Sequence, residues 1–104
     1  MPVEVRTIED VKPNGTRADE QLTVDDTGGG VQFAAFHEAT THVFWSSETA
    51  ECRVTFDGSV PTTVNGHVIP AGSSSIWSVA LAEAAKFVRT GGASAVIHVS
   101  QMVV

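Results

Sequence analysis

Charged residues are scarce in this sequence, and basic residues are the scarcest. Lys and Arg together number 6 and Asp and Glu 12, which gives a net charge of −6 at pH 7 and a charged share of 17%. In globular proteins, charged residues usually make up about a quarter of the sequence. No stripe of Lys and Arg is present that could neutralise phosphates, so direct nucleic-acid binding is not expected. The low charge instead favours a protein that lies against a neighbour in an assembly.

Cysteine and long apolar runs are equally rare. Cys52 is the single cysteine, which excludes an internal disulfide. Its place in the alternating run 51–56 predicts a buried side chain rather than an activated thiol. No apolar run is long enough to cross a membrane. The start of the chain, Met1–Arg6, has neither the basic nor the apolar region of a signal peptide, so we expect a protein made in the cytoplasm without a membrane partner.

Alternating apolar and polar residues, interrupted by turn residues, fill most of the chain. We expect strands at residues 3–8, 31–36, 41–46, 50–56, 75–79, 85–90 and 93–102, a short strand at 21–24 and a helical turn at 80–84. Turns are expected at 12–15, 57–58, 65–66 and 70–72. The strand at 93–102 is apolar on both faces near its middle, so it should lie centrally in a sheet. The pattern predicts a single all-β domain, an antiparallel β-sandwich or jelly-roll-like fold.

The first 30 residues differ from the rest of the chain. They hold seven of the 12 acidic residues and end in Asp25-Asp26-Thr27 and three glycines. The carboxylates do not alternate as in a calcium loop, and no Lys follows the glycines as in a phosphate-binding loop. We therefore predict an N-terminal strand and an extended, flexible acidic arm over residues 1–30, and a β-sandwich body over residues 31–104.

The four histidines are the first candidates for a metal or catalytic site. His37, Glu38 and His42 resemble part of a cupin metal site, but a cupin needs a His-x-His pair before its Glu. The later Pro70-Ala71-Gly72 has Ser75 where a cupin has its next His. His67 is expected in a turn or at a strand start, and His98 on a strand with a satisfied ring nitrogen. These failed spacings predict no metal site.

Nucleophilic catalysis is not indicated either. Ser73, Ser74 and Ser75 lie in no Gly-x-Ser-x-Gly elbow, so no catalytic or cofactor-binding residue is predicted and no enzyme is expected. Trp45, in an apolar run, is expected in the core. Trp77, flanked by serines and Ile76, is the better candidate for a contact residue or for a platform that stacks on a sugar.

One stretch resembles a known family. Arg53–Thr63 with its Asp-Gly-Ser-x-Pro-Thr turn, then Asn65-Gly66-His67, Pro70-Ala71-Gly72, Trp77, Ala85–Arg89 and Ala95–Gln101 follow one another as in small tailed-bacteriophage virion proteins. The resemblance covers about residues 41–102. The Asp-Gly-Ser-x-Pro-Thr turn also occurs in β-sandwich modules of carbohydrate-active enzymes.

The resemblance implies a non-enzymatic virion protein that decorates or cements the capsid. Its partners would be the major capsid protein, other virion proteins and copies of itself, with a trimer favoured. A component of the head–tail junction or tail, and a carbohydrate-binding module that uses Trp77, are the alternatives. An arm can add a strand to a neighbour's sheet, so the predicted interface residues are Val3, Val5, Ile8, Leu22, Val24 and Trp77.

Overall fold

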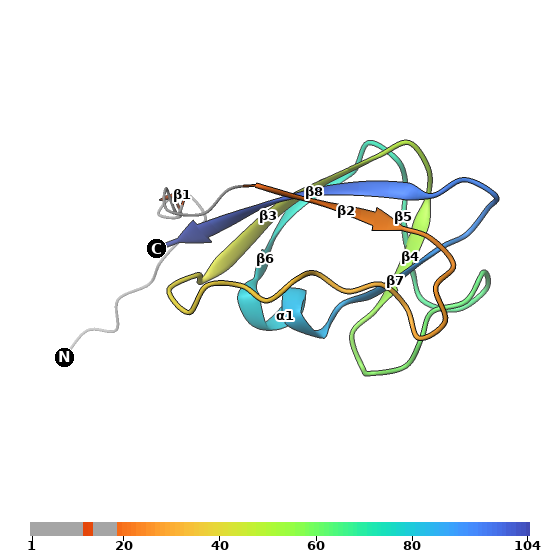
Figure 1. The fold of residues 1–104 in the computed structure, drawn as a ribbon, viewed down its shortest axis with the longest axis horizontal. Coiled ribbons are helices and arrows are strands. Elements are labelled where there is room, and N and C mark those ends of the chain that lie inside the picture. The colour runs from red at the N-terminus through yellow and green to blue at the C-terminus, as the bar shows by residue number, and fades with distance from the viewer. Residues whose placement is uncertain (1–11, 14–18) are drawn as a thin grey trace.

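The computed structural model describes residues 12–13 and 19–104, which form short strands and one helix (Figure 1). The elements are β1 (Lys12–Pro13), β2 (Glu20–Val24), β3 (His42–Glu48), β4 (Cys52–Thr55), β5 (His67–Ile69), β6 (Ser74–Ser78), α1 (Val79–Ala84), β7 (Lys86–Arg89) and β8 (Ala95–Val103).

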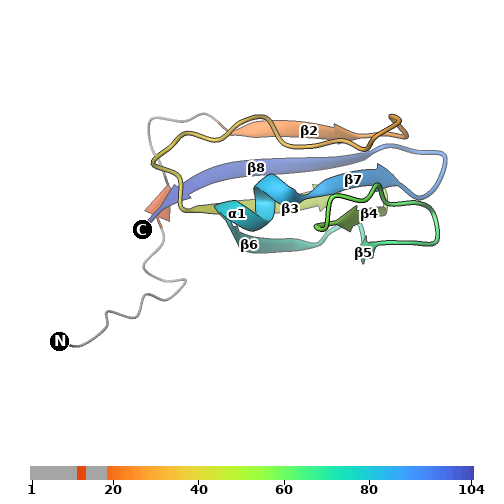
Figure 2. The same ribbon diagram turned by 90° about the horizontal axis from the view of Figure 1, so that it is seen from below.

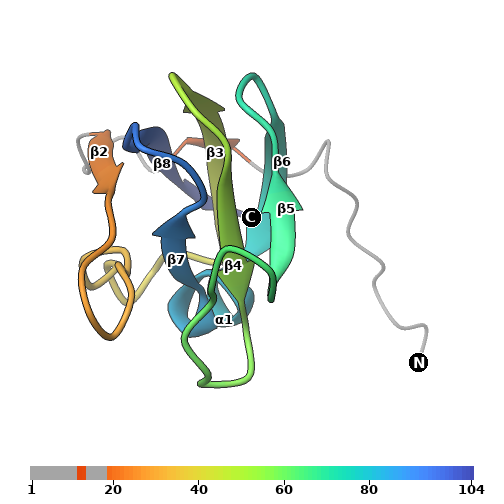
Figure 3. The same ribbon diagram turned by 90° about the vertical axis from the view of Figure 1, so that its right-hand side faces the viewer.

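These strands form two antiparallel sheets. The five-stranded sheet has the order β1-β8-β3-β6, with β2 also paired to β8, and the three-stranded sheet has the order β5-β4-β7. Figure 3 shows that β6 and β5 lie on one side of the molecule, and β2 and β7 on the other. β8 pairs with β1 and β2 along one edge and with β3 along the other, so the predicted central strand is confirmed.

The core lies between the sheets because alternate residues of each strand point inward. In β8, Ala95, Ile97 and Val99 are buried while His98 is exposed. Trp45 in β3 and Cys52 in β4 are buried as predicted. The other buried apolar side chains are Val24, Val43, Val54, Ile69, Ala82, Ala85 and Phe87.

Helix α1 connects the two sheets (Figure 2). The Ser78 hydroxyl accepts a hydrogen bond from the backbone N–H of Leu81, which caps the first turn. The extended backbone at Ala85 then ends the helix and leads into β7, so the predicted helical turn followed by a strand is confirmed. Within the described residues this six-residue helix is the longest, and it is too short to cross a membrane.

The strand predicted at 31–36 is wrong. Only Val31 makes a bridge there, to Phe87 of β7, and the following residues are irregular. A side chain fixes the residues that follow this segment: the Gln101 carboxamide oxygen accepts from the backbone N–H of His37 at 2.9 Å and from the Thr40 hydroxyl at 2.7 Å. The ring of Phe33 packs against that of Phe87, with 5.2 Å between the centroids.

The described part of the predicted arm belongs to the sheet. β2 pairs with β8 along its whole length, and Val24 at its end is fully buried, so residues 20–24 are part of the sheet and not of a flexible arm. Of the turn predicted at 12–15, the structure describes only Lys12 and Pro13, which form β1 and pair with Val103 and Met102. The strand predicted at 3–8, with Val3, Val5 and Ile8, lies outside the described residues.

Candidate binding surface at the β5–β6 edge

The two sides of the molecule differ in how the sheets are joined. On the β2–β7 side, the backbone N–H of Arg89 donates to the carbonyl of Asp25 at 3.0 Å, and Val31 and Phe87 exchange two backbone hydrogen bonds of 2.8 Å. The Arg89 guanidinium also lies 3.3 Å from the Asp26 carboxylate. These bonds join β7 to the segment that follows β2 and close this side.

The β5–β6 side has a groove between the sheets. Its volume is about 350 Å³, and its lining is mainly apolar. The lining residues are Trp45, Val54, Phe56, His67, Val68, Ile69, Pro70, Ser73, Ser75, Trp77 and Leu81. They come from β3, β4, β5, β6 and α1 and from the turns beside them, so only the folded chain brings them together.

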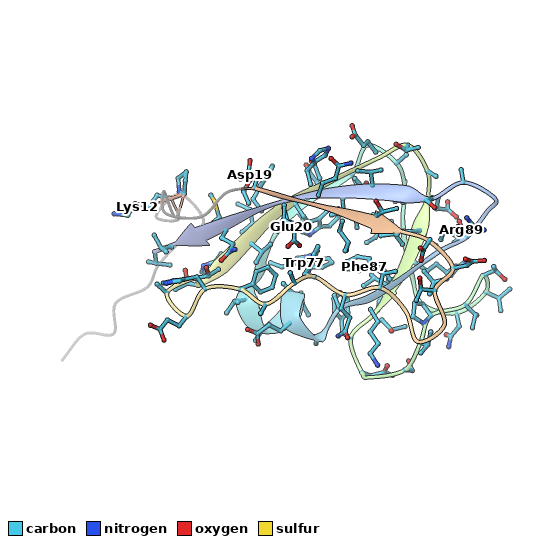
Figure 4. The ribbon with its side chains drawn as sticks, viewed as in Figure 1. Lys12, Asp19, Glu20, Trp77, Phe87 and Arg89 are labelled. Atoms are coloured by element: carbon cyan, nitrogen blue, oxygen red, sulfur yellow. The ribbon has the colours of Figure 1, made fainter. Side chains whose placement is uncertain are left out.

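Trp77 is the centre of an aromatic cluster at this groove. Its ring centroid lies 4.9 Å from that of Trp45, 5.2 Å from that of Phe56 and 6.3 Å from that of Phe87. The rings of Trp77 and Phe87 are nearly parallel, and Figure 4 shows the two side by side in the interior. Trp77 stays half-buried and forms a wall of the groove. The predicted contact residue is therefore fixed by three rings of its own chain rather than laid flat on the surface.

A polar atom lies unpaired in the same cluster. Trp45 is 4% exposed, and its indole Nε1 has no hydrogen-bond partner among the described residues. Leaving such a donor buried costs about 1–3 kcal/mol.

A second, polar pocket adjoins the groove and shares Phe56 and His67 with it. This pocket has a volume of about 470 Å³ and also contains Asp57, Ser59 and Asn65. The Asp57 carboxylate accepts hydrogen bonds from the Ser59 hydroxyl at 2.5 Å and the Ser59 backbone N–H at 3.0 Å. These bonds hold the pKa of Asp57 below its ordinary value. The Asp-Gly-Ser sequence thus forms a tight turn with a carboxylate that stays ionised.

Strand β6 is a free edge of the five-stranded sheet. It pairs with β3, and two backbone hydrogen bonds lie at the two ends of this pairing. The Val79 N–H donates to the Thr41 carbonyl, and the Ser47 N–H donates to the Ser73 carbonyl. Bonding alternates along an antiparallel strand, so Ser74, Ile76 and Ser78 direct their N–H groups away from β3. Within the described residues no other strand pairs with this edge.

The sequence marks this surface by a long run without charged residues, a feature that neither the strand pattern nor the motifs reveal. From Gly58 to Ala82 no Asp, Glu, Lys or Arg occurs, whereas 25 residues at the chain's 17% charged share would hold about four. This charge-free run contains both β5 and β6. Among residues 12–13 and 19–104, four of the five large apolar side chains that are exposed belong to it: Val60, Val64, Val68 and Leu81. The fifth, Phe44, lies beside Ile76 in the next strand.

The other predicted sites are separate in the structure. Among residues 12–13 and 19–104, no three His, Cys, Asp or Glu side chains are placed to share a metal, so His37, Glu38 and His42 do not come together. Burial raises the pKa of the Cys52 thiol to about 11, with a further contribution from Glu51. His67 starts β5, and the His98 ring nitrogen lies 2.8 Å from the Glu48 carboxylate.

The described interface candidates from the arm face inward. Val24 is fully buried in the chain's own core, and Leu22 packs against that core. Val24 therefore presents no surface to a partner.

Comparisons of the chain with protein-family models, with curated proteins and with solved structures gave no match.

Proposed function

We propose that the chain is a non-enzymatic structural protein of a tailed-bacteriophage virion that decorates or cements the capsid. It would act through contacts with the major capsid protein and with copies of itself. The observation that supports this proposal best is the β5–β6 side, where a free strand edge, exposed apolar side chains and a charge-free run coincide. The cores of protein interfaces are poor in charged residues in the same way.

The sequence resemblance supports the same proposal. It spans residues 41–102, and these residues contribute β3 to β8. We take the two-sheet fold as a jelly-roll-like β-sandwich, an architecture that capsid proteins use. The resemblance includes the turn at Asp57–Ser59 and the strands around that turn, so it extends over several successive elements and not over a single motif.

Quantitative mass spectrometry of purified virions tests the proposal. A decoration protein is expected in a copy number comparable to that of the major capsid protein. About a dozen copies would instead indicate a ring at the head–tail junction or in the tail, since heterologous contacts close into rings. A virion without the chain would overturn the proposal.

A deletion tests the N-terminal contact by itself. Because β2 is part of the sheet, the deletion should stop before it and remove residues 2–11, which include Val3, Val5 and Ile8. If these residues bind the shell, the truncated chain will occupy fewer sites on virions than the full chain. Unchanged occupancy would exclude the N-terminal segment from the contact.

The groove favours a second candidate function, a carbohydrate-binding module. Trp77 and Phe56 line an apolar groove beside a pocket with the polar side chains Asp57 and Asn65, and sugars bind where aromatic rings and polar groups meet. A glycan array with the parent chain and Trp77→Phe tests this function. Binding by the parent that the variant loses supports it, and no binding by the parent excludes it.

A further inference from the structure

The five-stranded sheet has two edges, and only one of them is protected against pairing. At one edge, β1 consists of Lys12 and Pro13, and β2 starts with Glu20 and is followed by Asp25 and Asp26. Proline and charged side chains are the usual means by which an edge strand is kept from pairing with another chain. At the other edge, β6 has the sequence Ser-Ser-Ile-Trp-Ser, with neither proline nor charge.

We propose that β6 pairs antiparallel with β6 of a second copy of this chain, about a twofold axis at Ile76. This inference assigns the self-contact in the proposed function to a particular strand, and it replaces the trimer that the sequence resemblance favours with a dimer. It can be tested without a virion, so its failure and that of the virion proposal are distinguishable.

The register follows from the free backbone groups. Because Ile76 directs its N–H and C=O away from β3, Ile76 of one copy can exchange both bonds with Ile76 of the other. Ser74 then lies opposite Ser78, and Ser75 opposite Trp77. The small serine leaves room for the indole, and β-branched residues such as the two isoleucines pair well across strands. The edge is thus self-complementary, as a twofold interface requires.

The surroundings of β6 suit a second copy of a chain with a net charge of −6. Two such chains repel each other where their acidic residues face one another. The charge-free run removes this repulsion at β6, and the pairing places the apolar row of Phe44 and Ile76 next to the same row of the other copy. Phe44, 39% exposed, would thereby lie on one continuous sheet face.

Light scattering after gel filtration provides the first test. The parent chain should have about twice the monomer mass of 10.9 kDa. Ile76→Lys and Ile76→Glu should each halve this mass, because residue 76 faces itself and two like charges then meet. Val64→Lys is the matched control, since Val64 is 85% exposed and lies outside β6, and it should remain a dimer.

Mixing the two charged variants tests the register itself. An equimolar mixture of Ile76→Lys and Ile76→Glu should recover the dimer mass, because the opposite charges now face each other. Circular dichroism melts of each variant show whether it is folded. A parent chain that is monomeric at about 1 mM or forms a trimer would overturn the inference. The inference would also be overturned if Ile76→Lys and Ile76→Glu were both folded and both stayed dimeric.

A crosslink keeps the inference testable if the charged variants do not fold. Across a hydrogen-bonded antiparallel pair the Cα atoms are about 5.5 Å apart, within the range of a disulfide. Ile76→Cys should therefore form a covalent dimer on mild oxidation. The parent should not, because its Cys52 is fully buried. No covalent dimer from Ile76→Cys would refute the pairing.

Discussion

Replacement of Phe87 by alanine is expected to be among the most destabilising substitutions in the chain. Phe87 in β7 is fully buried, and its ring contacts those of Phe33 and Trp77. Its backbone exchanges two hydrogen bonds with Val31. The ring therefore connects the irregular segment, the three-stranded sheet and the edge strand β6. Truncation leaves a cavity that none of these neighbours can fill without breaking other contacts.

The magnitude follows from the size of the lost ring. Phe→Ala in a well-packed core costs about 3–5 kcal/mol, out of a total stability of about 5–15 kcal/mol for a domain. At about 4–5 °C per kcal/mol, the melting temperature of Phe87→Ala should fall by roughly 12–25 °C. Val31 should also exchange its amide hydrogen faster, because the segment loses the ring on which Phe33 rests.

Urea unfolding followed by tryptophan fluorescence measures this loss, and Phe44→Ala is the matched control. Phe44 is the same residue type on the outer face of β3, 39% exposed, so its truncation leaves no enclosed cavity. We expect a loss of about 1 kcal/mol there. Equal losses in the two variants would show that the core does not lie between the sheets.

Three further outcomes are expected. Native Cys52 should react with a thiol reagent at least about 100-fold more slowly than the unfolded chain, because a pKa near 11 instead of 9.0 lowers the thiolate fraction; equal rates would contradict its burial. The pKa of Asp57 is lowered by Ser59, so its stabilising effect is complete at neutral pH and is lost as pH falls through the folded pKa. Asp57→Asn should accordingly lower the melting temperature at pH 7, and the deficit should narrow below about pH 4; a deficit independent of pH would refute this. Gly66→Ala should lower the free energy of unfolding, measured in urea, by roughly 2–4 kcal/mol, and Gly58→Ala should lower it by about 1–2 kcal/mol. Both glycines have positive φ, but of the two only Gly66 has another atom within 3.1 Å of the position that a Cβ would take.

Strands with regular alternation could be predicted from the sequence. Every second side chain is buried throughout β3, in the first three residues of β4 and in the first five residues of β8, and the alternating apolar residues identify the buried face. The helix over 79–84 was also predictable, because Ala, Leu and Glu favour helix and Ser78 is a good cap.

The segment at 31–36 could not be predicted from its apolar content. Phe33 and Phe36 both pack against the core, although residues three apart would point to opposite faces of a strand. A regular strand could therefore not place both rings against the core. The hydrogen bond between Thr40 and Gln101, which fixes the chain just after the segment, joins residues 61 apart in the sequence. Local patterns contain no information about such contacts.

The groove was predictable only in part. The sequence predicted Trp77 as a contact residue, but it could not show that the rings of Trp45, Phe56 and Phe87 pack around it from three other parts of the chain. Packing between sheets decides which ring is exposed. This is why a residue predicted to lie on a surface forms the wall of a groove instead.

Charge distribution is the part of the sequence that bears most directly on function. An uncharged strand at a free edge is a liability for a protein that works alone, because it offers backbone groups to any other strand. This chain places acidic residues beside β2 and a proline in β1, yet leaves the 25-residue run that contains β6 without charge. The difference between the two edges is explained if β6 is covered in the working assembly. An interface there also accounts for the low total charge, since a covered surface needs few charged side chains for solubility.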